Sequence, residues 1–148
     1  MSDQALKAVI FDWAGTLVDY GSRAPMGVFV EAFKRFGVDV TIDEARAPMG
    51  LPKRDHIQAL GNQPRVLEAW RAKHDRNFTE ADIDAVYDVF IPLNVEVVVD
   101  FADLIPGVAD TVRSLRERGL KIGSTTGYTR EIMKPLLPIA ARQGLEPD

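Results

Sequence analysis

The stretch that decides the fold is KAVIFDWAGTLVD, residues 7–19. Its apolar run, residues 8–11, ends in Asp12, and a Gly-Thr pair begins three residues after Asp12. This pattern is typical of a strand that is buried on both faces and delivers a carboxylate to the edge of a sheet where α/β folds bind ligands. We therefore predict a buried strand from Leu6 onward. Ala14 is the unusual residue, because many phosphate-handling sequences have a second aspartate there, acting as general acid and base.

The composition limits the classes of protein. The chain has 148 residues, of which 46% are hydrophobic and 27% charged, as expected for a soluble globular protein of one domain or slightly more. The net charge of -4 and the lack of a basic cluster argue against nucleic acid as a partner. Cysteine is absent, which excludes disulfides and thiolate metal sites. We expect a cytoplasmic protein, since the N-terminus is too polar for a signal peptide and no apolar run approaches a membrane span.

The order of the predicted elements indicates an insertion. Helical patterns follow the first strand, and a helix and a second buried strand come after them; the predicted helices start near residues 25, 42, 52, 64, 79, 109 and 129, and the second strand covers residues 120–127. Pro92 should kink or end one helix, and Pro135 and Pro138 should interrupt the last. The prediction is an α/β fold: residues 1–20 and 104–148 form the core, with residues 21–103 as a helical cap. Another strand would be expected after residue 148, so the core looks incomplete.

Two motifs carry a resemblance to a known family. FDWAGTL resembles the first motif of the haloacid dehalogenase superfamily, and STTGY resembles its second motif, whose hydroxyl binds the transferred phosphoryl group. Together with MGLPKRDHI, residues 49–57, they resemble the phosphonoacetaldehyde hydrolase family across essentially the whole chain. The resemblance implies a Rossmann-like core, Mg²⁺ as cofactor and a homodimer formed through the cap helices. It also implies hydrolysis of the carbon–phosphorus bond of phosphonoacetaldehyde to acetaldehyde and phosphate, in the degradation of 2-aminoethylphosphonate.

The resemblance also implies roles for particular residues. The catalytic set comprises the nucleophile Asp12, the Schiff-base Lys53, and Met49 and His56, which assist at the imine. The substrate-binding and metal-binding sets comprise Gly50, Thr126, Gly127 and Tyr128 for the substrate, and the Asp12 carboxylate with the Ala14 carbonyl for Mg²⁺. The family has a further basic residue and a distal acidic cluster, neither of which is found in these 148 residues.

Simple chemistry explains why such residues would occur together. Cleavage of a carbon–phosphorus bond would release a carbanion, and a protonated imine is an electron sink that converts this leaving group into an enamine. An acid at position 14 is then less needed to protonate the leaving group, and Ala14 leaves room for the substrate. Lys53 lies in the first turn of its predicted helix beside Arg54, so we expect its pKa to fall from about 10.4 to roughly 7–8. His56 shares that helix face and could shuttle protons.

Two alternatives stay open at this point. The first is an ordinary phosphatase or phosphomutase of the same superfamily, which Ala14 disfavours. The second is a truncated, non-catalytic chain without the distal magnesium acids, for which we expect little or no turnover. Such a chain would keep a cap that pairs with a second copy through the apolar faces around Phe33 and Tyr87. The Phe29, Phe33 and Phe36 stripe is expected to be either core or subunit contact.

Overall fold

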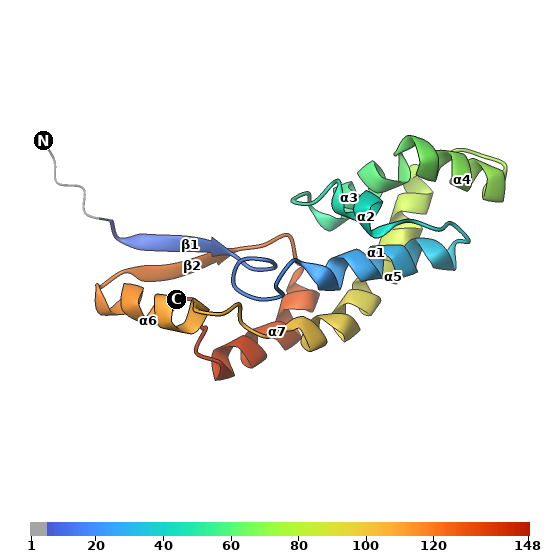
Figure 1. Ribbon diagram of the computed structural model, residues 1–148. Helices are drawn as coiled ribbons and strands as arrows, with labels where there is room; N and C mark the ends of the chain where they lie inside the picture. Colours follow the sequence, from blue (N-terminus) through green and yellow to red (C-terminus); the bar gives the residue numbers. More distant parts are fainter. Residues whose placement is uncertain (1–5) are drawn as a thin grey trace, which may run out of the picture.

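The computed structural model describes residues 6–148 and has two parts (Figure 1). Its elements along the chain are β1 (Ala8–Asp12), α1 (Arg23–Arg35), α2 (Ile42–Arg46), α3 (Lys53–Gly61), α4 (Pro64–His74), α5 (Glu80–Val98), the 3-10 helix η1 (Val99–Phe101), α6 (Val108–Glu117), β2 (Lys121–Thr125) and α7 (Arg130–Arg142). The strands, α6 and α7 lie at one end, and α2, α3 and α4 lie at the other. We call α1 to α5 with η1 the helical region and the rest the sheet region. Within the helical region, the long helices α1 and α5 pack side by side and reach from α2, α3 and α4 toward the sheet region.

The two strands form a parallel pair whose carboxyl ends coincide. Ala8 lies opposite Lys121, and Asp12 lies opposite Thr125. Because both strands end at the same edge of the sheet, the loop after β1 and the loop after β2 emerge next to each other. This register brings the two sequence motifs together although more than half of the chain separates them.

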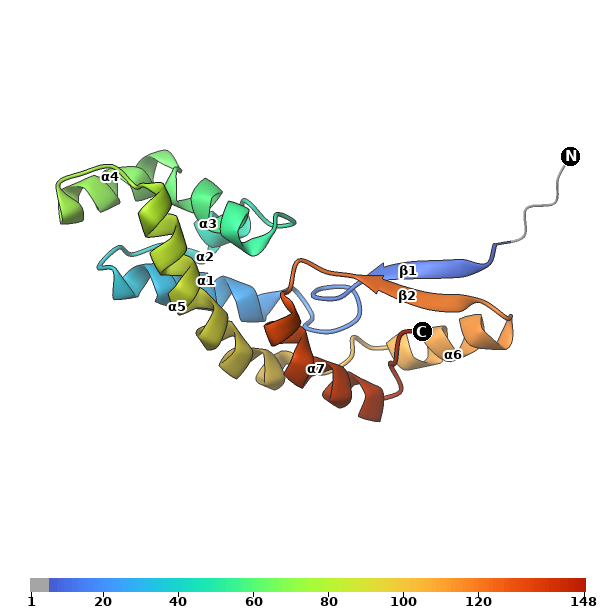
Figure 2. The same ribbon diagram turned by 180° about the vertical axis from the view of Figure 1, so that it is seen from behind.

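The prediction that the first strand is buried on both faces is wrong, and the second strand, predicted as buried, is buried only in part. Ile10 in β1 is 62% exposed, whereas Ile122 in β2 is fully buried. In residues 6–148 the sheet has only these two strands, and α6 and α7 both lie on one side of it (Figures 1 and 2). Alternate side chains of a strand point to opposite faces, so those on the uncovered side face solvent. The first strand also starts at Ala8, two residues later than predicted.

The helix starts agree with the sequence, but the proline breaks do not. Capping boxes are present at Thr41 and at Thr79, and α3 begins directly after Pro52. By contrast, α5 and α7 continue without interruption through their prolines. A proline leaves the carbonyl four residues earlier without its helical N–H partner. Here those carbonyls belong to exposed residues, where water can pair with them: Asp88, Glu131 and Lys134.

The aromatic stripe of α1 forms the core of the helical region. Phe29 stacks on Phe90 with ring centroids 4.3 Å apart, and Phe33 contacts the edge of Trp70 at 6.4 Å. Phe29 and Phe33 are both fully buried, while Phe36 is half-buried against Trp70. Of the two expectations for this stripe, core is therefore the one that holds for Phe29 and Phe33. The expected pairing through the faces around Phe33 and Tyr87 stays a prediction. Within residues 6–148, every helix is too short or too polar to traverse a lipid bilayer.

Candidate active site

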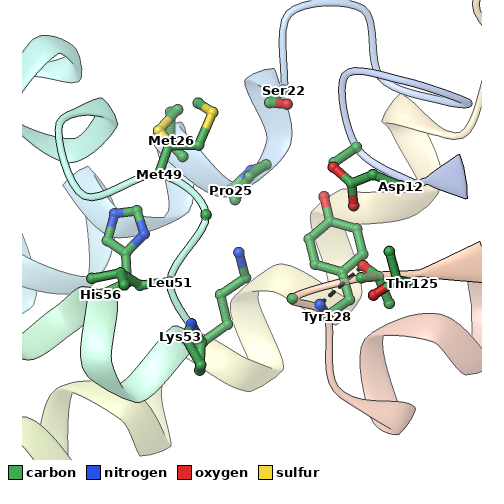
Figure 3. A pocket seen from close by; sticks show the side chains of 15 residues that line it. Asp12, Ser22, Pro25, Met26, Met49, Leu51, Lys53, His56, Thr125 and Tyr128 are labelled. Atoms are coloured by element: carbon green, nitrogen blue, oxygen red, sulfur yellow. Dashed lines mark hydrogen bonds between the residues drawn. The ribbon is translucent and has the colours of Figure 1, made fainter.

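A cavity of about 590 Å³ opens where the carboxyl ends of the strands face the helical region (Figure 3). All nine site residues predicted from the sequence line it: Asp12, Ala14, Met49, Gly50, Lys53, His56, Thr126, Gly127 and Tyr128. Six further lining residues were not predicted: Ser22, Pro25, Met26, Leu51, Pro52 and Thr125. The cavity therefore joins residues of the sheet region with residues of the helical region in one space.

The loop after β1 holds Asp12 at the mouth of the sheet. The backbone turns sharply around the fully buried Trp13, whose carbonyl accepts hydrogen bonds from the N–H groups of Leu17 and Val18 at 2.8 and 3.1 Å. Gly15 adopts a φ of +83°, which favours glycine. A Cβ at this position would also overlap the Ser22 hydroxyl, so both the backbone conformation and the available space favour glycine. The result is an exposed Asp12 carboxylate directed into the cavity from a hydrogen-bonded turn.

The loop after β2 contributes the opposite wall. The Tyr128 N–H donates to the Thr126 hydroxyl at 3.1 Å, which fixes the short turn through Gly127. The Tyr128 side chain is buried, its hydroxyl has no hydrogen-bond partner in the described residues, and it points toward Asp12 (Figure 3). Burial, with the negative charges of Asp19 and Asp12, raises the pKa of Tyr128 above its usual value. The phenol therefore stays protonated at neutral pH and is available as a hydrogen-bond donor.

Lys53 projects into the cavity from the first turn of α3. Its Nζ lies 5.2 Å from the centre of the Tyr128 ring and 5.8 Å from that of Phe29, between the two regions. Burial lowers the pKa of Lys53 to about 8, opposed by the nearby charge of Asp12. At pH 7.4 about 20% of such an amine is neutral, against ~0.1% for an unperturbed lysine. A half-buried amine with this pKa is suited to nucleophilic attack on a carbonyl.

The cause of this pKa shift differs from the expected one. Arg54 does not lower the pKa of Lys53, because its guanidinium is paired at 2.8 Å with both Glu80 and Asp84 on α5. That pairing points Arg54 to the solvent side of α3 and neutralises it locally. Desolvation by the surrounding side chains is the main reason why the ammonium form of Lys53 is disfavoured.

His56 is held as a neutral ring beside Lys53. Its Nε2 lies 2.7 Å from the Ala45 carbonyl oxygen, which only accepts, so Nε2 is assigned as the protonated nitrogen. The ring stacks on Phe29 at 3.9 Å, and burial lowers the pKa of His56 to about 4. Its Nδ1 is buried without a partner in the described residues. Any proton that His56 accepts must therefore go to Nδ1.

The loop between α2 and α3 closes the remaining side. Gly50 has a φ of +98°, a conformation that favours glycine, and its own Cβ position is open space. Met49 is 45% exposed at the rim of the cavity, and the buried Met26 of α1 also lines it (Figure 3). The two thioethers give this end of the cavity an apolar, adaptable wall.

Oxygen donors for a metal are few in this cavity. In residues 6–148 no group of three or more His, Asp or Glu side chains is placed to hold an ion. The Asp12 carboxylate and Ala14 both line the cavity, and a carboxylate with a backbone carbonyl suits a hard cation. Magnesium commonly keeps several waters and binds through one or two carboxylates plus substrate phosphates. The donor set therefore fits a hard divalent cation that takes most of its ligands from water and substrate.

Comparisons with known proteins agree with this arrangement. The profile of the family described as haloacid dehalogenase-like hydrolase matches residues 6–144. The phosphonoacetaldehyde hydrolase of Paraburkholderia phytofirmans is 61% identical over 143 residues, covering 97% of this chain and 54% of the relative. That of Vibrio parahaemolyticus is 51% identical over 149 residues, covering 100% and 55%. This chain thus spans about half the length of these curated relatives.

A solved structure is also similar. The crystal structure of a phosphonoacetaldehyde hydrolase like protein from Oleispira antarctica superposes with a TM-score of 0.94 at 40% identity. The match covers 96% of this chain and 51% of that one. The arrangement of strands and helices is therefore shared with a protein of that description.

Proposed function

Because this chain belongs to the haloacid dehalogenase-like hydrolase family, we propose that it provides the nucleophile and the Schiff-base lysine of a phosphonoacetaldehyde hydrolase. The observation that carries the proposal is the cavity in which the half-buried Lys53 amine and the Asp12 carboxylate open into one space beside Ala14. In this proposal residues 1–20 and 104–148 are the core and residues 21–103 are the cap. The phosphatase alternative is weaker, because Ala14 offers no acid for an alkoxide leaving group.

The first stage is formation of the imine on the cap. The neutral amine of Lys53 attacks the aldehyde carbon of phosphonoacetaldehyde, and the carbinolamine loses water to give a protonated imine. The unpartnered Nδ1 of His56 accepts a proton during this exchange, and the protonated Tyr128 hydroxyl donates a hydrogen bond to the departing oxygen. Met49 and Gly50 shape the apolar side around the two-carbon chain.

The second stage is transfer of the phosphonyl group to the core. The Asp12 carboxylate attacks phosphorus in line, the carbon–phosphorus bond breaks, and its electron pair moves into the imine to form an enamine. Protonation at carbon, followed by hydrolysis of the imine, releases acetaldehyde and restores Lys53. Water then hydrolyses the aspartyl-phosphate. The Thr126 hydroxyl and the amides of the turn at Gly127 offer hydrogen bonds to the phosphonyl oxygens.

The proposal includes a metal, a dimer and a location. Mg²⁺ held by the Asp12 carboxylate and the Ala14 carbonyl would offset the repulsion between a carboxylate and a phosphonate dianion. We also propose a homodimer through the cap helices. The cysteine-free composition is compatible with a reducing compartment, and we propose the cytoplasm.

Trapping the imine tests this function. The chain is incubated with phosphonoacetaldehyde and borohydride, and the reduced adduct is located by peptide mapping. We expect one adduct, on Lys53, that is absent from Lys53→Arg and absent without aldehyde. The exposed Lys34 and Lys73 are internal controls. Modification spread evenly over the exposed lysines, or none at Lys53 in a folded sample, would refute the Schiff-base mechanism. Faster release of phosphate from simple phosphate esters than from phosphonoacetaldehyde would favour the phosphatase.

A further inference from the structure

Two chain segments connect the helical region to the sheet region, and they run side by side. The outgoing segment, residues 17–22, leaves the loop after β1, and the returning segment, residues 102–105, follows η1. The Ile105 N–H donates to the Leu17 carbonyl at 2.9 Å, and the Asp19 N–H donates to the Asp103 carbonyl at 3.3 Å. These bonds form a short antiparallel ladder, with Val18 opposite Leu104. All covalent connection between the two regions passes through this ladder.

The outgoing segment is unusual in its backbone. Asp19, Gly21 and Ser22 have φ values of +56°, +84° and +49°, so three of four consecutive residues are left-handed. Non-glycine residues adopt this conformation infrequently, and local hydrogen bonds or packing commonly stabilise it. The Asp19 carboxylate supplies part of that stabilisation, since it accepts hydrogen bonds from the N–H groups of Arg23 and Ala24 at the start of α1. The ladder is therefore coupled directly to the direction of α1.

The returning segment is fixed from its other side by one side chain, Gln143 at the end of α7. Its Oε1 accepts a hydrogen bond from the Leu104 N–H at 3.1 Å, and its Nε2 donates to the Ala102 carbonyl at 2.9 Å. A second bond from Nε2 reaches the Ile139 carbonyl of its own helix at 3.2 Å. The amide thus pairs with the backbone as a neighbouring strand would, with both donor hydrogens and the acceptor in use.

We propose that Gln143 is a positioning residue that holds the returning segment in register and thereby sets how the helical region carries Lys53 over Asp12. The helix that ends at Gln143 begins just after the Thr126–Tyr128 turn, so one rigid element spans from the substrate cavity to the ladder. A glutamine satisfies this place because it offers a donor and an acceptor at the same reach. The link to Lys53 chemistry rests on the proposed function, whereas the mechanical role does not.

The test measures the placement of the two regions without substrate. The chain lacks cysteine, so paired spin labels can be attached at two introduced cysteines, Ala72→Cys on α4 and Arg118→Cys after α6, both at exposed positions. The distribution of distances between the two spin labels is compared for the chain that keeps Gln143 and for its Gln143→Leu and Gln143→Glu variants. Leucine removes all three hydrogen bonds at similar size, and glutamate keeps an acceptor for Leu104 if the first variant folds poorly. The exposed neighbour Arg142→Ala is the matched control.

We expect the distribution to broaden at least twofold in Gln143→Leu, less in Gln143→Glu, and not in Arg142→Ala. Amide exchange at Leu104 should accelerate about tenfold or more in Gln143→Leu, while the amide of Val112 within α6 keeps its rate. Turnover of the aldehyde should fall by about 10–100-fold through kcat, since small misplacements of reacting groups have effects of this order. Unchanged distances in a folded Gln143→Leu with fast exchange at Leu104 would overturn the proposal. Absent turnover in every variant would contradict the proposed function alone, because the distances are read without it.

Discussion

Replacing Lys53 by methionine should stabilise the fold while abolishing the proposed chemistry. Burial lowers the pKa of Lys53 from 10.5 to about 8, so the folded chain binds this proton less tightly than the unfolded chain does. Each pKa unit corresponds to ~1.4 kcal/mol, and the whole shift to about 3 kcal/mol against folding. Partial exposure of the side chain reduces this value, and we expect a gain of about 1–3 kcal/mol in the free energy of unfolding at pH 7.

The stabilisation gained by Lys53→Met should depend on pH, and the pKa shift of Lys53 determines the direction. Below pH 8 Lys53 is charged in both states, and the full penalty is present. Between the folded pKa of about 8 and the unfolded value of 10.5 the unfolded state binds more protons, so the stability contributed by this site rises with pH. Above the unfolded value the penalty is gone. The gain from Lys53→Met should therefore shrink as the pH rises from 7 to 10.5.

Urea unfolding of the two chains at both pH values is the assay, with the exposed Lys34→Met as control. Global changes at high pH affect both chains, so the quantity of interest is the difference between them at each pH. A Lys53→Met chain that gains no stability at pH 7 would show that the amine is well solvated. An equal gain at both pH values would assign the effect to packing of the methionine rather than to the charge.

Three further predictions concern the cavity and the helical core. Asp12→Asn removes the charge that raises the pKa of Lys53, so the pH midpoint for borohydride trapping with a simple aldehyde should move below about 8; an upward shift would contradict the electrostatics. The pKa of His56 is lowered to about 4, so its NMR ring signals should not titrate between pH 5.5 and 8; a midpoint near 6.5 would show that the ring is hydrated. In Gly61→Ala the new Cβ would overlap the Phe78 ring, which should lower the free energy of unfolding by about 1–3 kcal/mol in urea titrations; a neutral result would mean that the ring moves aside freely.

Much of the fold could be predicted because its signals are local. The capping boxes at Thr41 and Thr79 and the start of α3 after Pro52 depend on residues within one helical turn. The exposure of Ile10 could not be predicted in this way, since it depends on which elements cover the sheet. The continuity of α7 through Pro135 likewise depends on solvent access to a carbonyl, and the residue pattern does not contain that information.

The residues of the site likewise divide into those that local motifs predict and those that depend on the fold. The nine predicted residues lie in motifs that a family resemblance can carry, and all of them line the cavity. Ser22, Pro25 and Met26 were missed because they reach the cavity only through the left-handed turn before α1 and the packing of that helix. From its adjacency to Lys53 alone, Arg54 is expected to lower the pKa of that lysine electrostatically. Its partners on α5 are distant in the sequence, and only the fold reveals that they neutralise it.

The ladder between the two connecting segments has an evolutionary consequence. Since one hydrogen bond joins Asp19 to Asp103, the helical region enters and leaves the sheet region at a single point. An insertion with such closely spaced ends can be exchanged for another of different length without altering the register of β1 and β2 or the turn that presents Asp12. Under the proposed mechanism, the nucleophile would be inherited with the sheet, and the group that activates the substrate, an amine in this proposal, would be a property of the insertion at that point.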